Sequence, residues 1–160
     1  MLATRTDVLV RTVHDALTPE DEARLDEGAG LVVVGGGAWD PTLLARVTRA
    51  GILPRPCEPE RTGLAGDRAG LSAVTAEDLL ARVEAAEGTV GASLELSSGA
   101  APLLRSGRGV VVAAVADRAP GRVAVVAADL PEARWVQELV HNLWTWVAPR
   151  AAALAPAAER

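Results

Sequence analysis

The sequence contains no lysine, phenylalanine or tyrosine, and Cys57 is its single cysteine. Without lysine, Schiff-base chemistry and the phosphate-binding lysine of a P-loop are excluded. One thiol cannot form an internal disulfide or a zinc cluster of several cysteines, so a reducing compartment suits the chain. The aromatic residues are four tryptophans, which leaves few side chains for stacking on single-stranded nucleic acid.

Long apolar runs and excess positive charge are also missing. No uncharged stretch reaches the roughly 20 apolar residues of a membrane-spanning helix, and Arg5 and Asp7 interrupt the N-terminal segment where a signal peptide would need an apolar run. The formal net charge of -5 argues against binding to phosphate backbones. We therefore expect a cytoplasmic protein with neither a membrane nor a nucleic acid as partner. Arginine in place of lysine, with abundant alanine, glycine and proline, is typical of a bacterial chain.

The 160 residues, of which 49% are hydrophobic, supply enough apolar material for one core. We expect a single α/β domain over residues 1–148, followed by a flexible Ala/Pro tail over residues 149–160.

Capping and hydrophobic patterns predict the first half of the domain. Residues 7–10 read as a strand, and Thr18 followed by proline predicts the start of a helix. Residues 31–34 are all apolar, which is typical of a strand buried on both faces of a parallel sheet. A glycine turn ends that strand, and Asp40 followed by proline predicts the next helix.

The second half is predicted less evenly. Residues 52–72 contain prolines, glycines and charges, which indicates a long loop. The remaining predicted elements are a helix from Thr75 to Gly88, short strands at 94–96 and 102–104, a hairpin formed by 110–115 and 122–128, and a closing helix over 132–147.

Two groups of segments carry a resemblance to a known family. The first is the strand at 7–10, the helix at 17–25 and the Gly-rich strand and turn at 28–37, which together resemble the class I glutamine amidotransferase-like superfamily. The second is the strand at 121–130 and the helix that contains Trp135 and residues 141–147, which is similar to the closing part of trehalose-utilisation-type domains. The resemblance implies a flavodoxin-like three-layer sandwich with a mainly parallel sheet and a C-terminal antiparallel hairpin.

The chain departs from that family at the catalytic position. Catalytic members place a nucleophilic cysteine in the sharp turn after a central strand, and the corresponding turn here is Gly35-Gly36-Gly37-Ala38-Trp39. The resemblance therefore implies a pseudoenzyme without catalytic residues, which acts as a binding or assembly module. The sheet also lacks a full initial strand-helix unit, and an exposed edge favours a homo-oligomer or a companion subunit.

Several side chains are candidates for a ligand site. The glycine turn precedes a helix, and backbone N–H groups at the start of a helix can bind an anion. A tight turn between strand and helix explains the same glycines without any ligand. Asp129 follows a buried strand, and His141 lies on the closing helix. The candidate ligand-binding residues are Gly35, Gly36, Gly37, Trp39, Asp40, Asp129 and His141.

Two other functions stay open. The first is a sugar-metabolism enzyme that resembles trehalose-utilisation proteins, with a cleft around Asp40, Asp129 and His141; the second is a regulatory domain that binds a small polar ligand or sugar at the glycine turn. Trp144 falls on the apolar helix face, so Trp146 is the better exposed candidate for stacking a sugar or anchoring an interface. No cofactor or metal is expected, because the two histidines have no ligand-like spacing.

Overall fold

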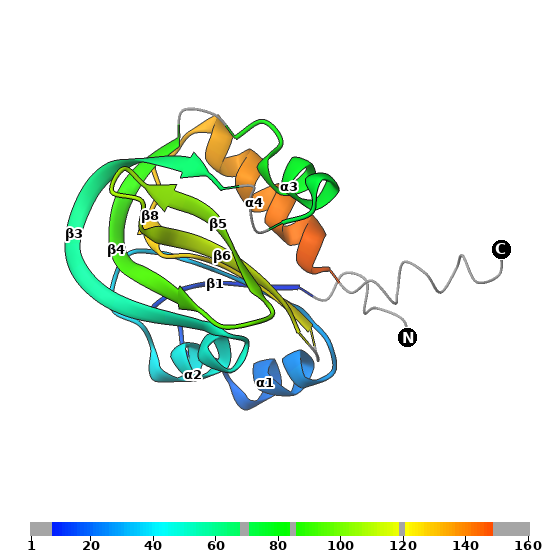
Figure 1. Cartoon of the computed structure of the whole chain (residues 1–160). Coiled ribbons are helices and arrows are strands. Elements are labelled where there is room, and N and C mark those ends of the chain that lie inside the picture. Colours follow the sequence, from blue (N-terminus) through cyan, green and yellow to red (C-terminus); the bar gives the residue numbers. More distant parts are fainter. Residues whose placement is uncertain (1–7, 68–70, 84–85, 119–120, 149–160) are drawn as a thin grey trace, which may run out of the picture.

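The computed structural model describes residues 8–67, 71–83, 86–118 and 121–148 (Figure 1). The helices are α1 (Pro19–Asp26), α2 (Pro41–Arg49), α3 (Ala73–Leu80) and α4 (Arg134–Val147). The strands are β1 (Val8–Thr12), β2 (Gly30–Val34), β3 (Ile52–Gly66), β4 (Ala86–Leu96), β5 (Ala100–Ser106), β6 (Val111–Arg118), β7 (Gly121–Val126) and β8 (Ala128–Asp129).

The strands form one mixed sheet in the order β1-β2-β7-β6-β5-β3-β4-β8. In the described residues, β1 and β7 pair with β2 in parallel, and the other five strand pairings are antiparallel. The predicted mainly parallel, flavodoxin-like sandwich is therefore wrong. Its parallel part exists, but a larger antiparallel part is joined to it through the β6–β7 hairpin.

The antiparallel part curls back on the parallel part. β8 directly continues β7 and pairs with β4, so the last strand in the order lies next in the chain to the third strand. At the junction, the Ala127 N–H donates to the Val112 carbonyl at 2.8 Å, and the Ala127 carbonyl accepts from the Gly91 N–H at 3.2 Å. Figure 1 shows β3 and β4 as long strands that arch around one side of the molecule.

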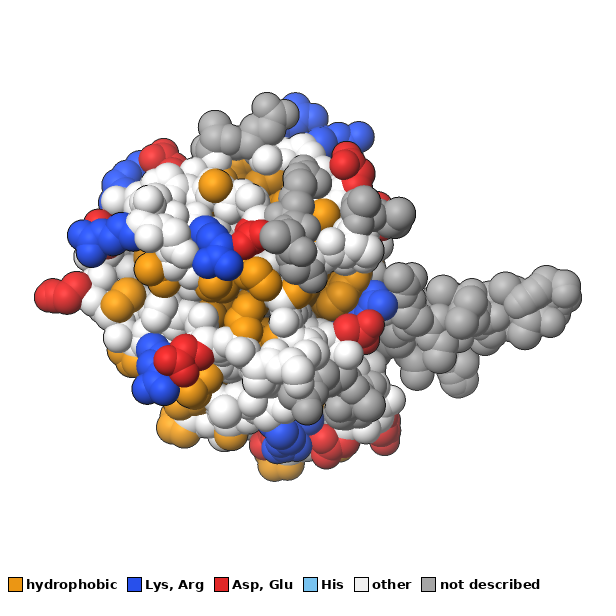
Figure 2. All heavy atoms as spheres, in the orientation of Figure 1, with side chains coloured by type: hydrophobic (Ala, Val, Ile, Leu, Met, Phe, Trp, Pro, Cys, Tyr) orange, Lys and Arg blue, Asp and Glu red, His pale blue; other side chains and the backbone are white. Residues whose placement is uncertain are grey.

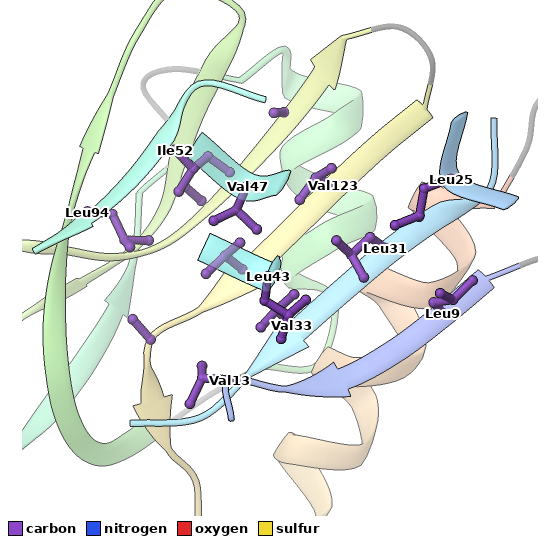
Figure 3. Close-up of a cluster of buried hydrophobic side chains, with 14 of the residues drawn as sticks. Leu9, Val13, Leu25, Leu31, Val33, Leu43, Val47, Ile52, Leu94 and Val123 are labelled. Carbon is purple, nitrogen blue, oxygen red and sulfur yellow. The ribbon is translucent and has the colours of Figure 1, made fainter. Parts of the chain in front are cut away.

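The core lies on both faces of the sheet. Leu31, Val32 and Val33 of β2 are fully buried, as predicted for a strand with neighbours on both sides. One face packs against α1 and α2, where Figure 3 shows Leu43 and Val47 of α2 among the side chains of the parallel strands. The other face packs against α3 and α4.

The predicted helix starts at Thr18 and Asp40 are confirmed. Thr18 and Asp21 form a reciprocal capping box at α1, and Asp40 caps α2 through the Thr42 N–H. The hairpin is also confirmed, because β6 and β7 pair antiparallel from Ala113–Val126 to Arg118–Gly121. The loop tip at residues 119–120 and the predicted tail at 149–160 lie outside the described residues.

The predicted loop over 52–72 is wrong, because β3 occupies most of it. Pro54 and Pro56 pair with β4, whereas β5 pairs with β3 only from Leu64 onward. The missing N–H groups of these prolines therefore fall on the side of β3 that has no ladder. Pro59 lies in a bulge, where the register shifts between Pro56 and Glu60. Edge segments and bulges are the places where a sheet tolerates proline.

The predicted helix from Thr75 to Gly88 is too long. α3 ends at Leu80, and β4 begins at Ala86. Alternate residues of β4 from Ala86 to Leu94 are buried, which is the two-residue period of a strand. Gly88, which was predicted to end the helix, and Gly91 both lie within this strand.

Candidate functional site

The carboxyl ends of β1, β2 and β7 meet at one edge of the sheet. After β2 the chain enters α2, which packs on the first core face, and after β7 and β8 it enters α4, which packs on the second. In open α/β sheets, ligands bind in the crevice between two such strands. The predicted site residues between Gly35 and Asp40 follow β2, and Asp129 follows β7. They therefore lie where a ligand crevice would be expected.

The chain itself fills this crevice. The Gly36 N–H donates to Asp129 Oδ1 at 2.9 Å. A Cβ atom on Gly36 would lie 2.9 Å from the Thr89 carbonyl oxygen, and one on Gly91 would overlap the Gly36 carbonyl. The backbones of the glycine turn and of β4 are therefore in direct contact, and a carboxylate of the chain takes the place of an external anion.

The carboxylate of Asp40 is also bound by groups of the chain itself. It accepts from the Thr42 N–H at 2.9 Å and from the Thr42 hydroxyl. The bond from the Thr42 hydroxyl lowers the pKa of Asp40 below its usual value of 3.8. The Asp40 N–H donates to the Val13 carbonyl at 2.8 Å. Asp40 is thus an ionised cap for α2, and its charge opposes an anion at that helix end.

Sequence reasoning missed His14 and Asp15, which follow β1 at this edge. The Asp15 carboxylate accepts from the Thr12 N–H at 3.0 Å, and this bond lowers the pKa of Asp15 below 3.8. The Nε2 atom of His14 lies 3.2 Å from the hydroxyl oxygen of Thr12. Only the strand order, which places β1 beside β2, could have associated these residues with the glycine turn.

Trp39 is half-buried and packs against the core cluster of the α1–α2 face. Its indole Nε1 is buried and has no hydrogen-bond partner in the part of the chain that the structure describes. Leaving this donor unpaired lowers the stability of the fold by about 1–3 kcal/mol. Because the side chain packs against the core cluster, Trp39 is a packing residue here.

The other candidates do not join the glycine turn. His141 is exposed on α4 and has no hydrogen bond or ion pair within the described residues, so no contact unites it with Asp40 or Asp129. Asp117 pairs with Arg122 at 3.2 Å at the start of β7, whereas Asp129 follows its end. In the described ranges, no group of three or more His, Cys, Asp or Glu side chains could hold a metal ion.

The tryptophans of α4 differ from the prediction. Trp146 is half-buried against the core, and the Arg122 guanidinium lies 4.3 Å from its ring centroid. The Arg122 Nη1 also donates to the Trp146 carbonyl at 2.9 Å. Trp146, predicted as the better exposed tryptophan, thus packs against the core cluster of the α3–α4 face, and Arg122 covers one face of its ring.

The charges on the visible face do not form a basic patch. Figure 2 shows arginine and acidic side chains interspersed over this face, with hydrophobic side chains between them. None of the described helices combines the length and the apolar character needed to cross a membrane.

The sequence matches no family model and no curated protein. Among solved structures, the chain is similar to a cold-adapted β-galactosidase from Rahnella sp. R3 (TM-score 0.61, 15% identity), of which it covers 22% while 86% of its own residues align. It is also similar to a cytoplasmic protein from Salmonella typhimurium (TM-score 0.58, 12% identity, 89% of this chain and 72% of that one). A third similar structure is the mmIFT52 N-terminal domain (TM-score 0.57, 16% identity, 88% and 76%).

These identities establish likeness of fold alone. The chain spans less than a quarter of the β-galactosidase it resembles. None of these three proteins is described as an amidotransferase. With the mostly antiparallel sheet, they correct the amidotransferase-like, flavodoxin-like description to a mixed fold that resembles a part of β-galactosidases.

Proposed function

We propose that the chain is a non-catalytic assembly domain that binds a second copy of itself in the cytoplasm. The observation that carries this proposal is the filled crevice at the carboxyl ends of β2 and β7. There, Asp129 binds the Gly36 amide, and β4 packs against the glycine turn. A site where related architectures hold substrate is thus used for internal packing, which leaves the outer surface as the functional part.

The fold comparisons support a domain that works within larger assemblies. The fold occurs as a minor part of a β-galactosidase chain and as the N-terminal domain of mmIFT52. A fold used repeatedly as one part of a longer protein suits a role in holding proteins together.

The surface that we assign to assembly is the free edge of β1. In the described residues, β1 pairs only with β2, and Val10 on β1 is 44% exposed. The edge is partly guarded, because Arg11 Nη1 donates to the Val10 carbonyl at 3.0 Å. Asp15 binds both the N–H and the carbonyl of Thr12. The open part of the edge is therefore its first half, around Val8 and Val10.

A second copy fits this edge in charge and polarity. An antiparallel pair with its two-fold axis at Val10 places Val10 opposite Val10 and Leu9 opposite Arg11, so no like charges face each other. The exposed bond from Arg11 to the Val10 carbonyl would be exchanged for a ladder hydrogen bond. Because the open segment is short, we expect concentration-dependent association rather than a permanent dimer.

The test is sedimentation velocity of the full chain over a wide concentration range. We expect a monomer–dimer equilibrium that Val10→Lys abolishes, because a lysine there introduces like charges across the two-fold axis. Val110→Lys is the matched control, since Val110 is 38% exposed and lies outside β1. A monomer at every concentration, or equal effects of the two substitutions, would overturn the proposal.

A further inference from the structure

A pocket distinct from the filled crevice lies where the bulge of β3 faces β4 and the turn after β5, on the other side of Gly91 from the glycine turn. Its volume is about 580 Å³. Ligand pockets usually measure about 300–1,000 Å³. We propose that this pocket binds a small organic cation, in which a short alkyl chain ends in an ammonium or guanidinium group.

The fold builds this pocket through one irregularity. Between Pro56 and Glu60 the register of β3 shifts, so that Cys57, Glu58 and Pro59 stand opposite the single residue Gly91 of β4. The extra residues move β3 outward, and all three line the pocket. Bulges occur preferentially beside binding sites, where they redirect side chains. Gly91 cannot move away from the bulge, because the glycine turn packs directly behind it.

The opposite rim is a fixed turn. The Ser106 N–H donates to the Val110 carbonyl, and the Gly109 N–H donates to the Ser106 carbonyl, both at 2.9 Å. The Ser106 hydroxyl accepts from the Arg108 N–H at 3.2 Å. Arg105 Nη1 also donates to the Gly109 carbonyl at 2.8 Å. The pocket wall is therefore ordered without a ligand, which lowers the entropic cost of binding.

The charges of the lining favour a cation. Glu58 and Glu60 outnumber Arg108, which is the one basic residue among them. Arg108 Nη2 lies 3.1 Å from Glu60 Oε2, but their side chains are 76% and 43% exposed, so this pair is weak. Glu58 has no hydrogen bond or ion pair within the described residues. Its carboxylate is thus available to an incoming positive group.

The uncharged part of the lining suits a short alkyl chain. Val90 is buried, and Val110 and Pro59 add apolar surface. Ser93 contributes a hydroxyl that can accept from an ammonium group. A sugar is disfavoured because no aromatic ring lines the pocket on which it could stack. An anion is disfavoured because it would face two carboxylates.

Cys57 is a built-in reporter, since it is the sole cysteine of the chain, it is exposed, and it lines the pocket. The experiment measures the rate at which iodoacetamide alkylates Cys57 as spermidine or n-butylammonium is added. We expect saturable slowing of the alkylation by both amines, and none by butyrate or butanol at the same concentrations. Each variant is compared with itself in the absence of amine, so that changes in intrinsic thiol reactivity cancel.

Glu58→Gln should raise the apparent Kd of spermidine by about threefold, because it removes the negative partner of an exposed ion pair. Glu27→Gln is the matched control, since it removes the same charge from an exposed position at the end of α1 and should leave the Kd unchanged. Absence of saturable protection by either amine would overturn the proposal, as would equal protection by butyrate or equal weakening by both variants. Because Val10→Lys leaves the pocket intact, failure of self-association and failure of cation binding are distinguished in the same set of proteins.

Discussion

At the scale of single residues, Gly91 is the position where the absence of a side chain matters most. A Cβ atom there would overlap the Gly36 carbonyl, and both groups are backbone that cannot yield without moving a strand. We expect Gly91→Ala to lower the free energy of unfolding by more than about 3 kcal/mol, the upper range for overpacking. Urea unfolding of the purified variant measures this.

Gly37 gives the comparison, because a Cβ atom on it meets nothing within 4 Å. Gly37→Ala should change the free energy of unfolding by no more than about 0.5 kcal/mol. If the two alanine variants were equally stable, the glycine turn would not be packed against β4, and the filled crevice would lose its basis.

Asp129 supplies the polar half of the same contact. Asp129→Ala leaves the Gly36 amide without its carboxylate, so we expect a loss of about 1 kcal/mol in the free energy of unfolding. Asp117→Ala is the control, since the Asp117 side chain is 63% exposed in its pair with Arg122 and should contribute less than about 0.5 kcal/mol. Equal losses in thermal or urea unfolding would show that the Asp129 bond has no special weight.

At the scale of secondary-structure elements, the features that depend on residues adjacent in sequence were predicted correctly, whereas a strand that depends on distant partners was not. The caps at Thr18 and Asp40 and the buried strand Leu31–Val34 depend on neighbours in sequence, and the structure confirms them. β3 was read as a loop because its prolines are acceptable only when one side of the strand has no partner, which depends on where β5 lies.

The candidate site shows the same division. Gly36 and Asp129 were both named from the sequence, but their contact requires β2 and β7 to be neighbours across 93 residues. Gly91 and Thr89, which close the crevice, were missed. A glycine inside a strand signals a close backbone approach, but the prediction ended a helix at Gly88 and placed Thr89 and Gly91 in no strand.

The start of α4 offers a gain in stability. Ala133 has the extended backbone of an N-cap (φ -152°, ψ 157°), yet among the described residues no side chain caps this helix. We expect Ala133→Ser to raise the free energy of unfolding by about 0.5–1 kcal/mol, and Thr18→Ala at α1 to lower it by about 1 kcal/mol. Differential unfolding in urea measures both. An unchanged Ala133→Ser variant would mean that the α4 amides already have partners.

At the scale of the whole molecule, the carboxylates on the parallel side of the sheet connect stability to pH. The pKa values of Asp15 and Asp40 lie below the usual 3.8 because of hydrogen bonds from Thr12 and Thr42. Burial works to raise the pKa of Asp21, but the Thr18 N–H and the charge of Arg11 lower it overall. All three groups therefore hold protons less tightly in the folded chain than in the unfolded one.

The sign of the effect follows from that difference. A folded-state pKa below the unfolded value gives stability that is complete above the unfolded pKa and is lost as the pH falls through the folded one. We expect the free energy of unfolding to stay nearly constant from pH 7 to about 5 and to decline steeply below about 4.

Arg11→Met isolates one contribution to this decline. The methionine keeps apolar bulk but removes the charge 3.1 Å from Asp21, so the folded-state pKa of Asp21 should rise toward its unfolded value. Unfolding measured from pH 7 to pH 3 should then show a shallower acid decline than in the native chain, with the largest difference between the two proteins at neutral pH. A decline of the same steepness in both proteins would mean that Arg11 does not set the ionisation of Asp21, and that the acid sensitivity resides in the carboxylates beside the glycine turn.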